Sequence, residues 1–268
     1  MPGEAGTRRE TALNEDWNTM ASPVEQFEIK EIVSFGTIGD APLALTNSGL
    51  YMLVVVGLIL GVMSIATRNV ALIPNRWQAF GETLYEFVAN MLRDAAGKEG
   101  MTFFPLVFSL FLFVLVANLV GMVPTAFTIT SHIIVTFALA MLVIGTVVIY
   151  GLVKHGTHFF GLFVPSGVPG WLLPFITLIE VISFLSRPIS LSLRLFANML
   201  AGHIALNVFA TFIVSLLGAG GLVAVLAPLP LLMTFAMVGF EIFVAALQAY
   251  VFAVLTCIYL NDALHPGH

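Results

Sequence analysis

The sequence has few charged residues and almost no cysteine. Only 9% of its 268 residues are Asp, Glu, Lys or Arg, whereas a soluble domain usually carries about a quarter. The single cysteine, Cys257, excludes a disulfide framework and a zinc motif, and we expect neither a metal nor a cofactor. The sequence contains no Walker-type phosphate loop. A formal net charge of −5 argues against nucleic-acid binding, which needs a basic surface.

Apolar residues are abundant and lie in long runs. They make up 59% of the chain, and the mean hydropathy is +1.01. A helix needs about 20 apolar residues to cross the ~30 Å hydrocarbon core of a membrane. Five runs reach or exceed this length, at residues 48–67, 102–123, 130–153, 171–217 and 222–260. The sequence therefore predicts an all-α membrane protein with about five membrane-crossing helices.

Two of these runs are too long for an upright span. Residues 171–217 would form a helix about 70 Å long, which is more than twice the thickness of the hydrocarbon core. No polar turn divides this run, although Pro188 could bend it. We expect one long, strongly tilted helix, with two spans joined by a buried corner as the alternative. Residues 222–260 permit the same interpretation, so that the two helices form a hairpin.

The remaining sequence divides into an extension and one embedded domain. The first 48 residues hold eight acidic and three basic residues, and we interpret residues 1–47 as an acidic N-terminal extension. Residues 48–268 are predicted to form a single membrane-embedded helical domain. Within it, residues 75–95 carry apolar side chains at three- and four-residue steps and polar side chains opposite them. This pattern predicts an amphipathic helix at the membrane interface.

The basic residues indicate the orientation. They gather after the first apolar run and between the third and fourth runs, whereas the turns at 122–130 and 217–229 contain no Lys or Arg. By the positive-inside rule, the basic side faces the cytoplasm or its organellar equivalent. With five crossings, this places the N-terminal extension outside and the C-terminus inside.

Charged residues recur on one stripe of the fourth run. Glu180, Arg187 and Arg194 are spaced by seven, and Asn198 follows on the same stripe. Because charges in a membrane core are costly, this stripe faces protein or water. Glu180 and Arg187 can form a structural ion pair. Arg194 has no acid within one turn, so we expect a functional cation whose acidic partner belongs to another subunit.

A second polar group lies on the opposite face of the same helix. His203 is nine residues beyond Arg194, which places it half a turn away. On the last run, Glu241 and Gln248 are seven apart and share a stripe. An antiparallel hairpin centred near residues 221–222 brings His203 level with Glu241, and Arg194 level with Gln248. His203 and Glu241 can each gain and lose a proton, so they are candidates for a proton path. The alternative is that His203 only forms a hydrogen bond between helices.

These residues lie in segments that resemble a known family. SRPISLSLRLFANMLAGH, at 186–203, closely resembles the signature of subunit a of F-type rotary ATP synthases. NLVGMVP at 118–124, LIEVISFLSRP at 178–188 and EIFVAALQAYVFAVLTCIYL at 241–260 extend the resemblance. PVEQFEIKEI at 23–32 resembles alphaproteobacterial members, and RLFANMLAGH also resembles the mitochondrial form. The resemblance implies a bacterial inner membrane in preference to the mitochondrial one.

The resemblance also implies roles and partners. Arg194 matches the arginine that faces the rotor carboxylate, and Asn198 and Gln248 match polar residues beside it. His203 and Glu241 match the pair of the outer half-channel, in the reverse order to many bacterial members. Glu180 matches an acid of the inner half-channel. The implied partners are the c-subunit ring, the b-type peripheral stalk subunits, the rest of the F-type complex and membrane lipid. The implied role is that of a stator subunit with no enzymatic activity of its own.

Two other functions make different predictions. An ion-coupled secondary transporter predicts broken helices around a substrate site and an acid paired with Arg194 in the same chain. A purely structural membrane subunit predicts that Arg194→Ala leaves proton flow intact. The resemblance favours the proton-channel stator, in which two half-channels couple proton translocation to rotation of the c-ring.

Overall fold

The computed structural model describes residues 31–38, 41–68, 71–123, 126–163, 171–220 and 225–264. The predicted fold class is confirmed, because long helices make up most of the described residues from 47 onward. A short antiparallel hairpin precedes them, formed by β1 (Glu31–Ile38) and β2 (Ala41–Thr46). The sequence pattern did not predict this hairpin. Residues 1–30, most of the predicted acidic extension, lie outside the described residues.

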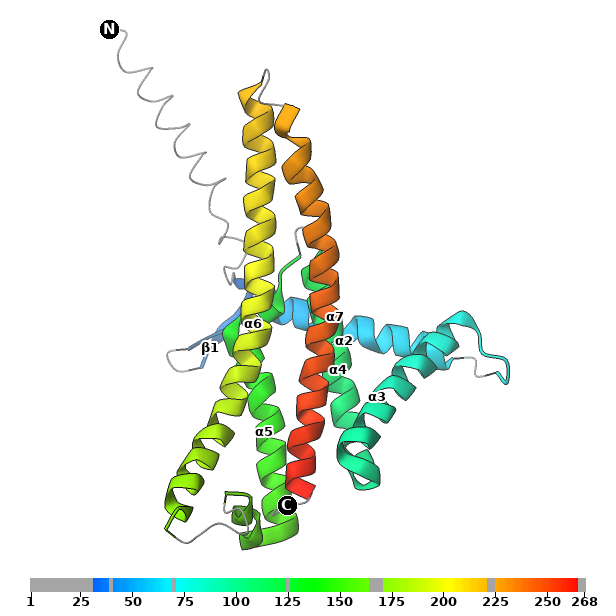
Figure 1. Ribbon diagram of the computed structural model, residues 1–268. Coiled ribbons are helices and arrows are strands. Elements are labelled where there is room, and N and C mark those ends of the chain that lie inside the picture. The colour runs from blue at the N-terminus through cyan, green and yellow to red at the C-terminus, as the bar shows by residue number, and fades with distance from the viewer. Residues whose placement is uncertain are drawn as a thin grey trace.

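The first two helices form an elbow at one side of the molecule. α2 (Asn47–Thr67) begins at Thr46, whose side chain accepts a hydrogen bond from the Gly49 N–H and caps the helix. α3 (Arg76–Gly100) contains all but the first residue of the predicted amphipathic segment 75–95 and runs five residues further, with Asn75 as its N-cap. Gly97 interrupts α3 near its end with φ of 65°, a conformation that side chains with a Cβ rarely adopt. Figure 1 shows α2 and α3 meeting away from the other helices.

The next helices form a hairpin closed by a short loop. After the 3₁₀ turn η2 (Met101–Phe103), α4 (Phe104–Gly121) begins with a proline in its first turn, where the missing N–H costs no hydrogen bond. η3 (Ile129–Ser131) then leads into α5 (Ile133–His155), and η4 (Gly156–Phe163) follows. All three residues of η3 are buried, so this loop is part of the packed interior.

The two longest helices confirm the prediction of a long helical hairpin. α6 (Leu173–Ala219) runs for 47 residues without a break, so the alternative of two spans with a corner is wrong. α7 (Pro228–Leu264) runs antiparallel beside it (Figure 1). Gly220 ends α6 with φ of 64°. The predicted turn centre at 221–222 lies outside the described residues.

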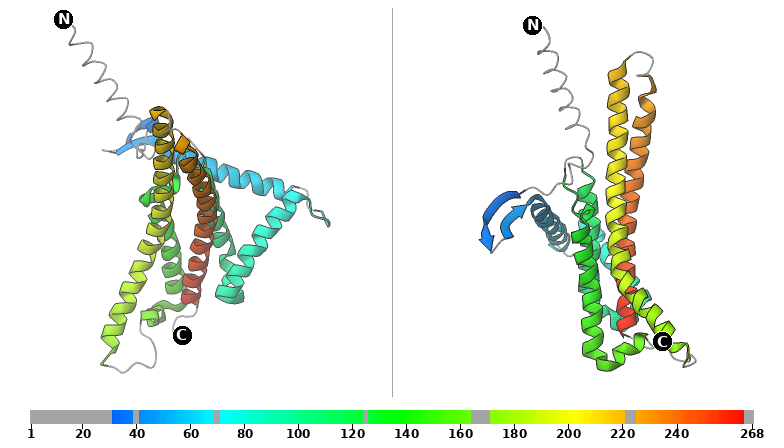
Figure 2. Two further views of the ribbon diagram at one scale, coloured as in Figure 1. Left: turned by 45° about the horizontal axis from the view of Figure 1, so that its top comes forward. Right: turned by 90° about the vertical axis from the view of Figure 1, so that its left-hand side faces the viewer.

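The relative directions of the helices support a strong tilt of α6 and α7 from the membrane normal. Among the described residues, five helices are long and apolar enough to cross a membrane. The views in Figures 1 and 2 agree that α2 lies across the axes of α6 and α7. These three helices therefore cannot all stand upright in one bilayer. If α2 follows the membrane normal, α6 and α7 lie strongly tilted, which accommodates their excess length.

The hydrophobic core lies between α3, α4, α5 and α7. Its fully buried members include Leu92, Val107, Val143, Phe252 and Leu260. α6 touches this core along one narrow stripe of residues at helical spacing, Phe184, Leu191 and Leu195, and the buried Met199 continues the stripe beyond the core. Much of the remaining surface of α6 is exposed. The fold thus leaves one flank of α6 uncovered while its other flank packs against the protein.

Candidate functional site

The structure brings His203 and Glu241 together between α6 and α7. The distance from His203 Nε2 to Glu241 Oε1 is 3.9 Å. Both side chains are buried or nearly so, with exposed fractions of 12% for His203 and 3% for Glu241. A carboxyl group and an imidazole enclosed at this distance can exchange a proton through one intervening water, or directly after a small approach to hydrogen-bond distance.

Gly202 makes room for the carboxylate of Glu241. A Cβ atom at position 202 would lie 2.5 Å from Glu241 Oε1 and 3.0 Å from its Cδ. Only glycine therefore permits the carboxylate to rest against the backbone of α6. Gly202 thus leaves space for the carboxylate of Glu241, and His203, the next residue, supplies the imidazole beside it.

A loop from the α4–α5 hairpin completes the surroundings of His203. Thr128 donates a hydrogen bond to the carbonyl of Gly121 (3.2 Å), and its Oγ1 lies 3.0 Å from His203 Nε2. The direction of the Thr128–His203 hydrogen bond follows the tautomer of the imidazole, since the Thr128 hydroxyl can accept from an N–H at Nε2 or donate to an unprotonated Nε2. Thr128 therefore contacts the ring nitrogen that faces Glu241. Sequence analysis missed Thr128, since a residue in a loop carries no helical spacing that marks it.

Several polar atoms near this pair are buried without a protein partner. Among the described residues, Glu241 Oε1 and Oε2, Asn118 Oδ1 and Thr130 Oγ1 make no hydrogen bond. Asn118 is fully buried on α4, and its amide donates to the carbonyl of Ala245, one turn beyond Glu241 (3.4 Å). Buried polar groups of this kind are the usual partners of internal water. The chemistry of the cluster therefore suits a hydrated path.

Arg194 and Asn198 lie on the uncovered flank of α6. Both are exposed, and within the described part of the chain neither forms an ion pair or a hydrogen bond through its side chain. Leu195 and Met199, their neighbours in sequence, are buried on the inner stripe. The predicted separation of Arg194 from His203 onto different faces is thus confirmed. Arg194 is a cation presented outward with no acid of its own.

Gln248 and Arg194, which the register placed at one level, differ in burial. Gln248 is buried on α7, with an exposed fraction of 7%, and no hydrogen bond connects it to Arg194 in the described structure. Its neighbours Ala245, Ala249 and Phe252 are also buried, so this face of α7 packs inward. The hairpin brings together His203 and Glu241, but it leaves Arg194 and Gln248 in different environments.

A charged cluster links the first half of α6 to the end of α7. Arg187 Nη1 lies 2.7 Å from Asp262 Oδ2, and Arg187 Nη2 lies 3.9 Å from Glu180 Oε1. The guanidinium also lies over the ring of Tyr259, at 4.9 Å from the ring centroid. The predicted Glu180–Arg187 pair is therefore present, but the shorter contact is with Asp262, which sequence analysis missed.

No metal site accompanies these groups in the described residues, where no three His, Cys, Asp or Glu side chains gather. The charged and polar groups instead form three separate sets. The Glu241–His203–Thr128 set is enclosed, the Arg194–Asn198 set is open, and the Glu180–Arg187–Asp262 set joins two helices.

Comparison with known proteins identifies relatives along most of the chain. A family model described as the ATP synthase A chain matches residues 49–261. ATP synthase subunit a of Azorhizobium caulinodans is 63% identical over 246 residues, which cover 92% of this chain and 98% of the relative. The subunit a of Xanthobacter autotrophicus is 61% identical over 246 residues, with the same coverage. That of Rhizobium leguminosarum is 63% identical over 246 residues, covering 91% of this chain and 98% of the relative.

Proposed function

Because the chain belongs to the ATP synthase A chain family and is a multi-pass inner-membrane subunit of an F-type ATP synthase, we propose that it forms two proton half-channels and couples proton translocation to rotation of the c-subunit ring. The observation that carries this proposal is the division of α6 into two faces. The enclosed His203–Glu241 pair lies on one face, and the open cation Arg194 lies on the other.

The enclosed pair is the candidate outer half-channel. Glu241 and His203 can each accept and release a proton, and Thr128 and Asn118 supply further polar atoms around them. A proton that arrives from the outer side passes through this cluster to a carboxyl group of the c-ring. Protonation neutralises that carboxyl group, so it can then face lipid while the ring turns.

Arg194 is the candidate electrostatic barrier between the two half-channels. A guanidinium stays charged at every physiological pH, so it cannot relay a proton. Its charge attracts a c-ring carboxylate and favours the ionised form, so the ring releases its proton on reaching the inner side. Because Arg194 has no acid partner among the described residues, its charge is available to a partner that arrives and leaves again. A membrane potential of 100 mV supplies about 2.3 kcal/mol per charge moved.

The Glu180–Arg187–Asp262 set is the candidate exit on the inner side. It lies near the C-terminal end of α7, and its two carboxylates are partly exposed. The orientation that accompanies this assignment has the N-terminal extension outside and the C-terminus inside. The c-ring and the b-type peripheral stalk are the proposed direct partners, and other subunits carry out nucleotide chemistry.

The alternative of a self-contained secondary transporter fits less well. That function predicts helices broken around a central substrate site. α6 and α7 instead continue for 47 and 37 residues. The transporter also needs an acid of this chain beside Arg194, and the described residues provide none.

The proposal is tested by proton pumping in membrane vesicles that contain the assembled complex. Arg194→Ala should abolish ATP-driven pumping, because the barrier and the attraction for the rotor carboxylate are both lost. Arg194→Lys retains the charge and separates its effect from that of the guanidinium shape. Arg76→Ala, which removes an exposed arginine at the start of α3, is the matched control. Normal coupled pumping by Arg194→Ala would refute the stator assignment.

A further inference from the structure

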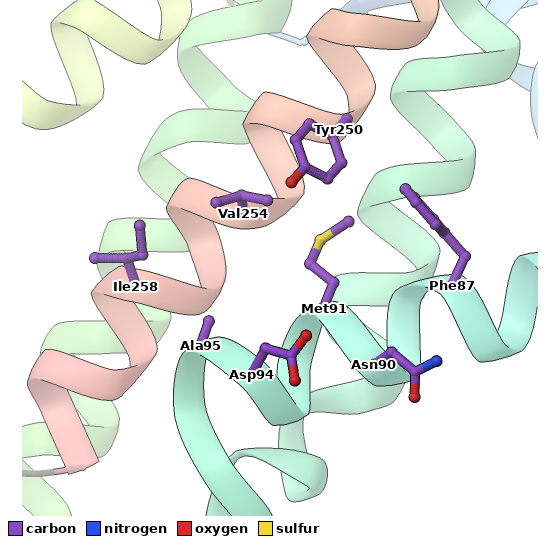
Figure 3. A pocket seen from close by; sticks show the side chains of 8 residues that line it. All are labelled: Phe87, Asn90, Met91, Asp94, Ala95, Tyr250, Val254 and Ile258. Carbon is purple, nitrogen blue, oxygen red and sulfur yellow. The ribbon is translucent and has the colours of Figure 1, made fainter.

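A groove runs between α3 and α7, and none of the residues that line it belongs to the three polar sets described above. Figure 3 shows Phe87, Met91 and Ala95 of α3 facing Tyr250 and Ile258 of α7 across it. The cavity between these helices has a volume of about 500 Å³. This volume lies within the range of about 300–1,000 Å³ that is typical of small-molecule sites.

The groove continues into a second cavity deeper along α7. Phe87 and Tyr250 line both cavities, and the second has a volume of about 270 Å³. Its other walls are entirely apolar and come from α4 and α7, with Phe111 and Leu115 on α4 and Phe243 on α7. From Ile258 to Phe243 the groove follows 15 residues of α7, or about 22 Å. This length is about half of the ~40–45 Å thickness of a complete bilayer.

Polarity changes along the groove in one direction. The end near Ile258 carries the side chains of Asn90 and Asp94, both exposed, whereas the end near Phe243 is apolar. Asp94 and Asn90 come from the polar side of an amphipathic helix, and this pattern is typical of a helix at a membrane interface. An occupant of the whole groove therefore has a polar head at the interface and an apolar tail toward the membrane core.

The polar end carries one charge of each sign. Asp94 supplies a carboxylate, and Arg93 donates a hydrogen bond from Nη1 to Asn90 Oδ1 (3.4 Å), which brings a guanidinium beside the same end. A phosphate group complements Arg93, and an ammonium group complements Asp94. A purely anionic headgroup would meet repulsion from Asp94. The pair of charges thus matches a zwitterionic headgroup.

The size of the second cavity distinguishes a lipid chain from a protein helix. The ring centroids of Phe87 and Tyr250 lie 5.8 Å apart, which is direct contact, so the two rings form a floor shared by both cavities and an occupant lies across them. An α-helix, about 10–12 Å in diameter with its side chains, does not fit the second cavity of about 270 Å³, whereas a single acyl chain is much narrower. We propose that this groove binds one zwitterionic aminophospholipid, with its headgroup at Asp94 and Arg93 and an acyl chain along α7 toward Phe243.

Photocrosslinking in the assembled complex tests this proposal. The complex is reconstituted with a phosphatidylethanolamine that carries a diazirine in one acyl chain, or with a phosphatidylglycerol that carries the same chain. Crosslinked peptides are identified by mass spectrometry. We expect the ethanolamine lipid to label the segment of α7 around residues 243–250 more strongly than the glycerol lipid does.

Three variants show which part of the lipid each wall recognises. Ala246→Trp adds a large side chain at an exposed position of the apolar cavity and should lower labelling at least tenfold. Asp94→Ala should lower labelling by the ethanolamine lipid about two- to fivefold, as expected for the loss of one exposed ion pair. Asp94→Lys should reverse the preference in favour of phosphatidylglycerol. Glu86→Ala removes an exposed acid of α3 that does not line the groove and should leave labelling unchanged.

The proposal has clear contrary outcomes. Equal labelling by the two lipids, or labelling that Ala246→Trp does not reduce, would overturn it. Crosslinking of residues 243–250 to another protein subunit instead of to lipid would also overturn it. Co-purification of the other subunits shows that each variant is assembled, and Asp94→Lys provides the test even if Ala246→Trp does not assemble.

Discussion

The carboxylate of Glu241 on α7 rests against Gly202 on α6, so closely that a Cβ at position 202 would lie 2.5 Å from Oε1. The contact joins the two long helices at the level of His203, which is the next residue of α6. The space that one glycine leaves open therefore sets the position of a buried acid. Two consequences of this contact are open to measurement.

Gly202→Ala should displace Glu241 and slow proton uptake from the outer side. The added methyl group forces the carboxylate to move by about 1 Å, and a displacement of that size in a reacting group can cost about a hundredfold in rate. We expect ATP synthesis driven by an imposed proton gradient to fall at least about tenfold. Gly218→Ala is the matched control, because nothing lies within 4 Å of a Cβ at that position of the same helix. Equal effects of the two substitutions would rule out this role of Gly202.

The roles of His203 and Glu241 should be coupled. The two side chains lie 3.9 Å apart, so removal of either one changes the surroundings of the other. We expect the effects of His203→Ala and Glu241→Gln on outer-side proton uptake to be non-additive, with an interaction of about 0.5–3 kcal/mol. A double-mutant cycle of passive proton conduction measures this quantity. Additive effects would mean that the two residues serve independent paths.

His132 should make the loop between α4 and α5 sensitive to acid. Burial lowers the pKa of His132 from its usual value near 6.5, and its ring stacks on Phe127 with 4.8 Å between centroids. The folded state disfavours the charged imidazole of His132. The contribution of the buried neutral imidazole to the free energy of unfolding is therefore fully present above about pH 6.5, and it is lost as the pH falls through the lowered pKa. His132→Gln should therefore reduce the loss of thermal stability between pH 7.5 and pH 5.

The readout for that experiment is the only thiol of the chain. Cys257 is buried, so maleimide labelling of its peptide on heating reports the unfolding of this subunit within the complex. His155→Gln, which changes a histidine at the other end of α5, serves as the control. If His132→Gln and the parent chain lose stability equally on acidification, His132 is not the responsible group.

The sequence predicted the features that follow from helical period and from the cost of buried charge. The seven-residue spacing and the half-turn offset placed Arg194 and His203 on different faces, and the structure confirms this. The hairpin register also placed Glu241 level with His203. These inferences worked because they depend only on the geometry of a regular helix.

The sequence did not predict contacts that depend on where elements dock. Thr128 belongs to a loop, and a loop has no regular spacing of apolar residues that would indicate which helix it packs against. Asp262 was missed because the hairpin is not in constant register. From the His203–Glu241 contact to the Arg187–Asp262 contact, the chain runs 16 residues along α6 but 21 along α7. The first part of α6 inclines away from α7 (Figure 1), and Pro188, which lacks an N–H donor, lies in this part.

Asp262 should stabilise the hairpin more than Glu180 does. Its carboxylate lies 2.7 Å from Arg187 and is 27% exposed, whereas that of Glu180 lies at 3.9 Å and is 36% exposed. A well-enclosed pair costs about 3–5 kcal/mol to break and a surface pair up to about 1 kcal/mol. We therefore expect Asp262→Ala to cost about 1–3 kcal/mol and Glu180→Ala less than about 1 kcal/mol.

Thermal labelling of Cys257 again measures this difference, since that thiol lies on α7 between Glu241 and Asp262. Arg187→Ala should cost at least as much as Asp262→Ala, because it also removes the contacts with Glu180 and Tyr259. The double variant should lose little more than Arg187→Ala alone, because both substitutions break the Arg187–Asp262 contact. Glu99→Ala is the control for an acid in an exposed ion pair, that with Lys154. If Glu180→Ala proved as costly as Asp262→Ala, the Glu180–Arg187 pair within α6 would stabilise the hairpin as much as the Arg187–Asp262 contact between α6 and α7. The prediction would then be wrong.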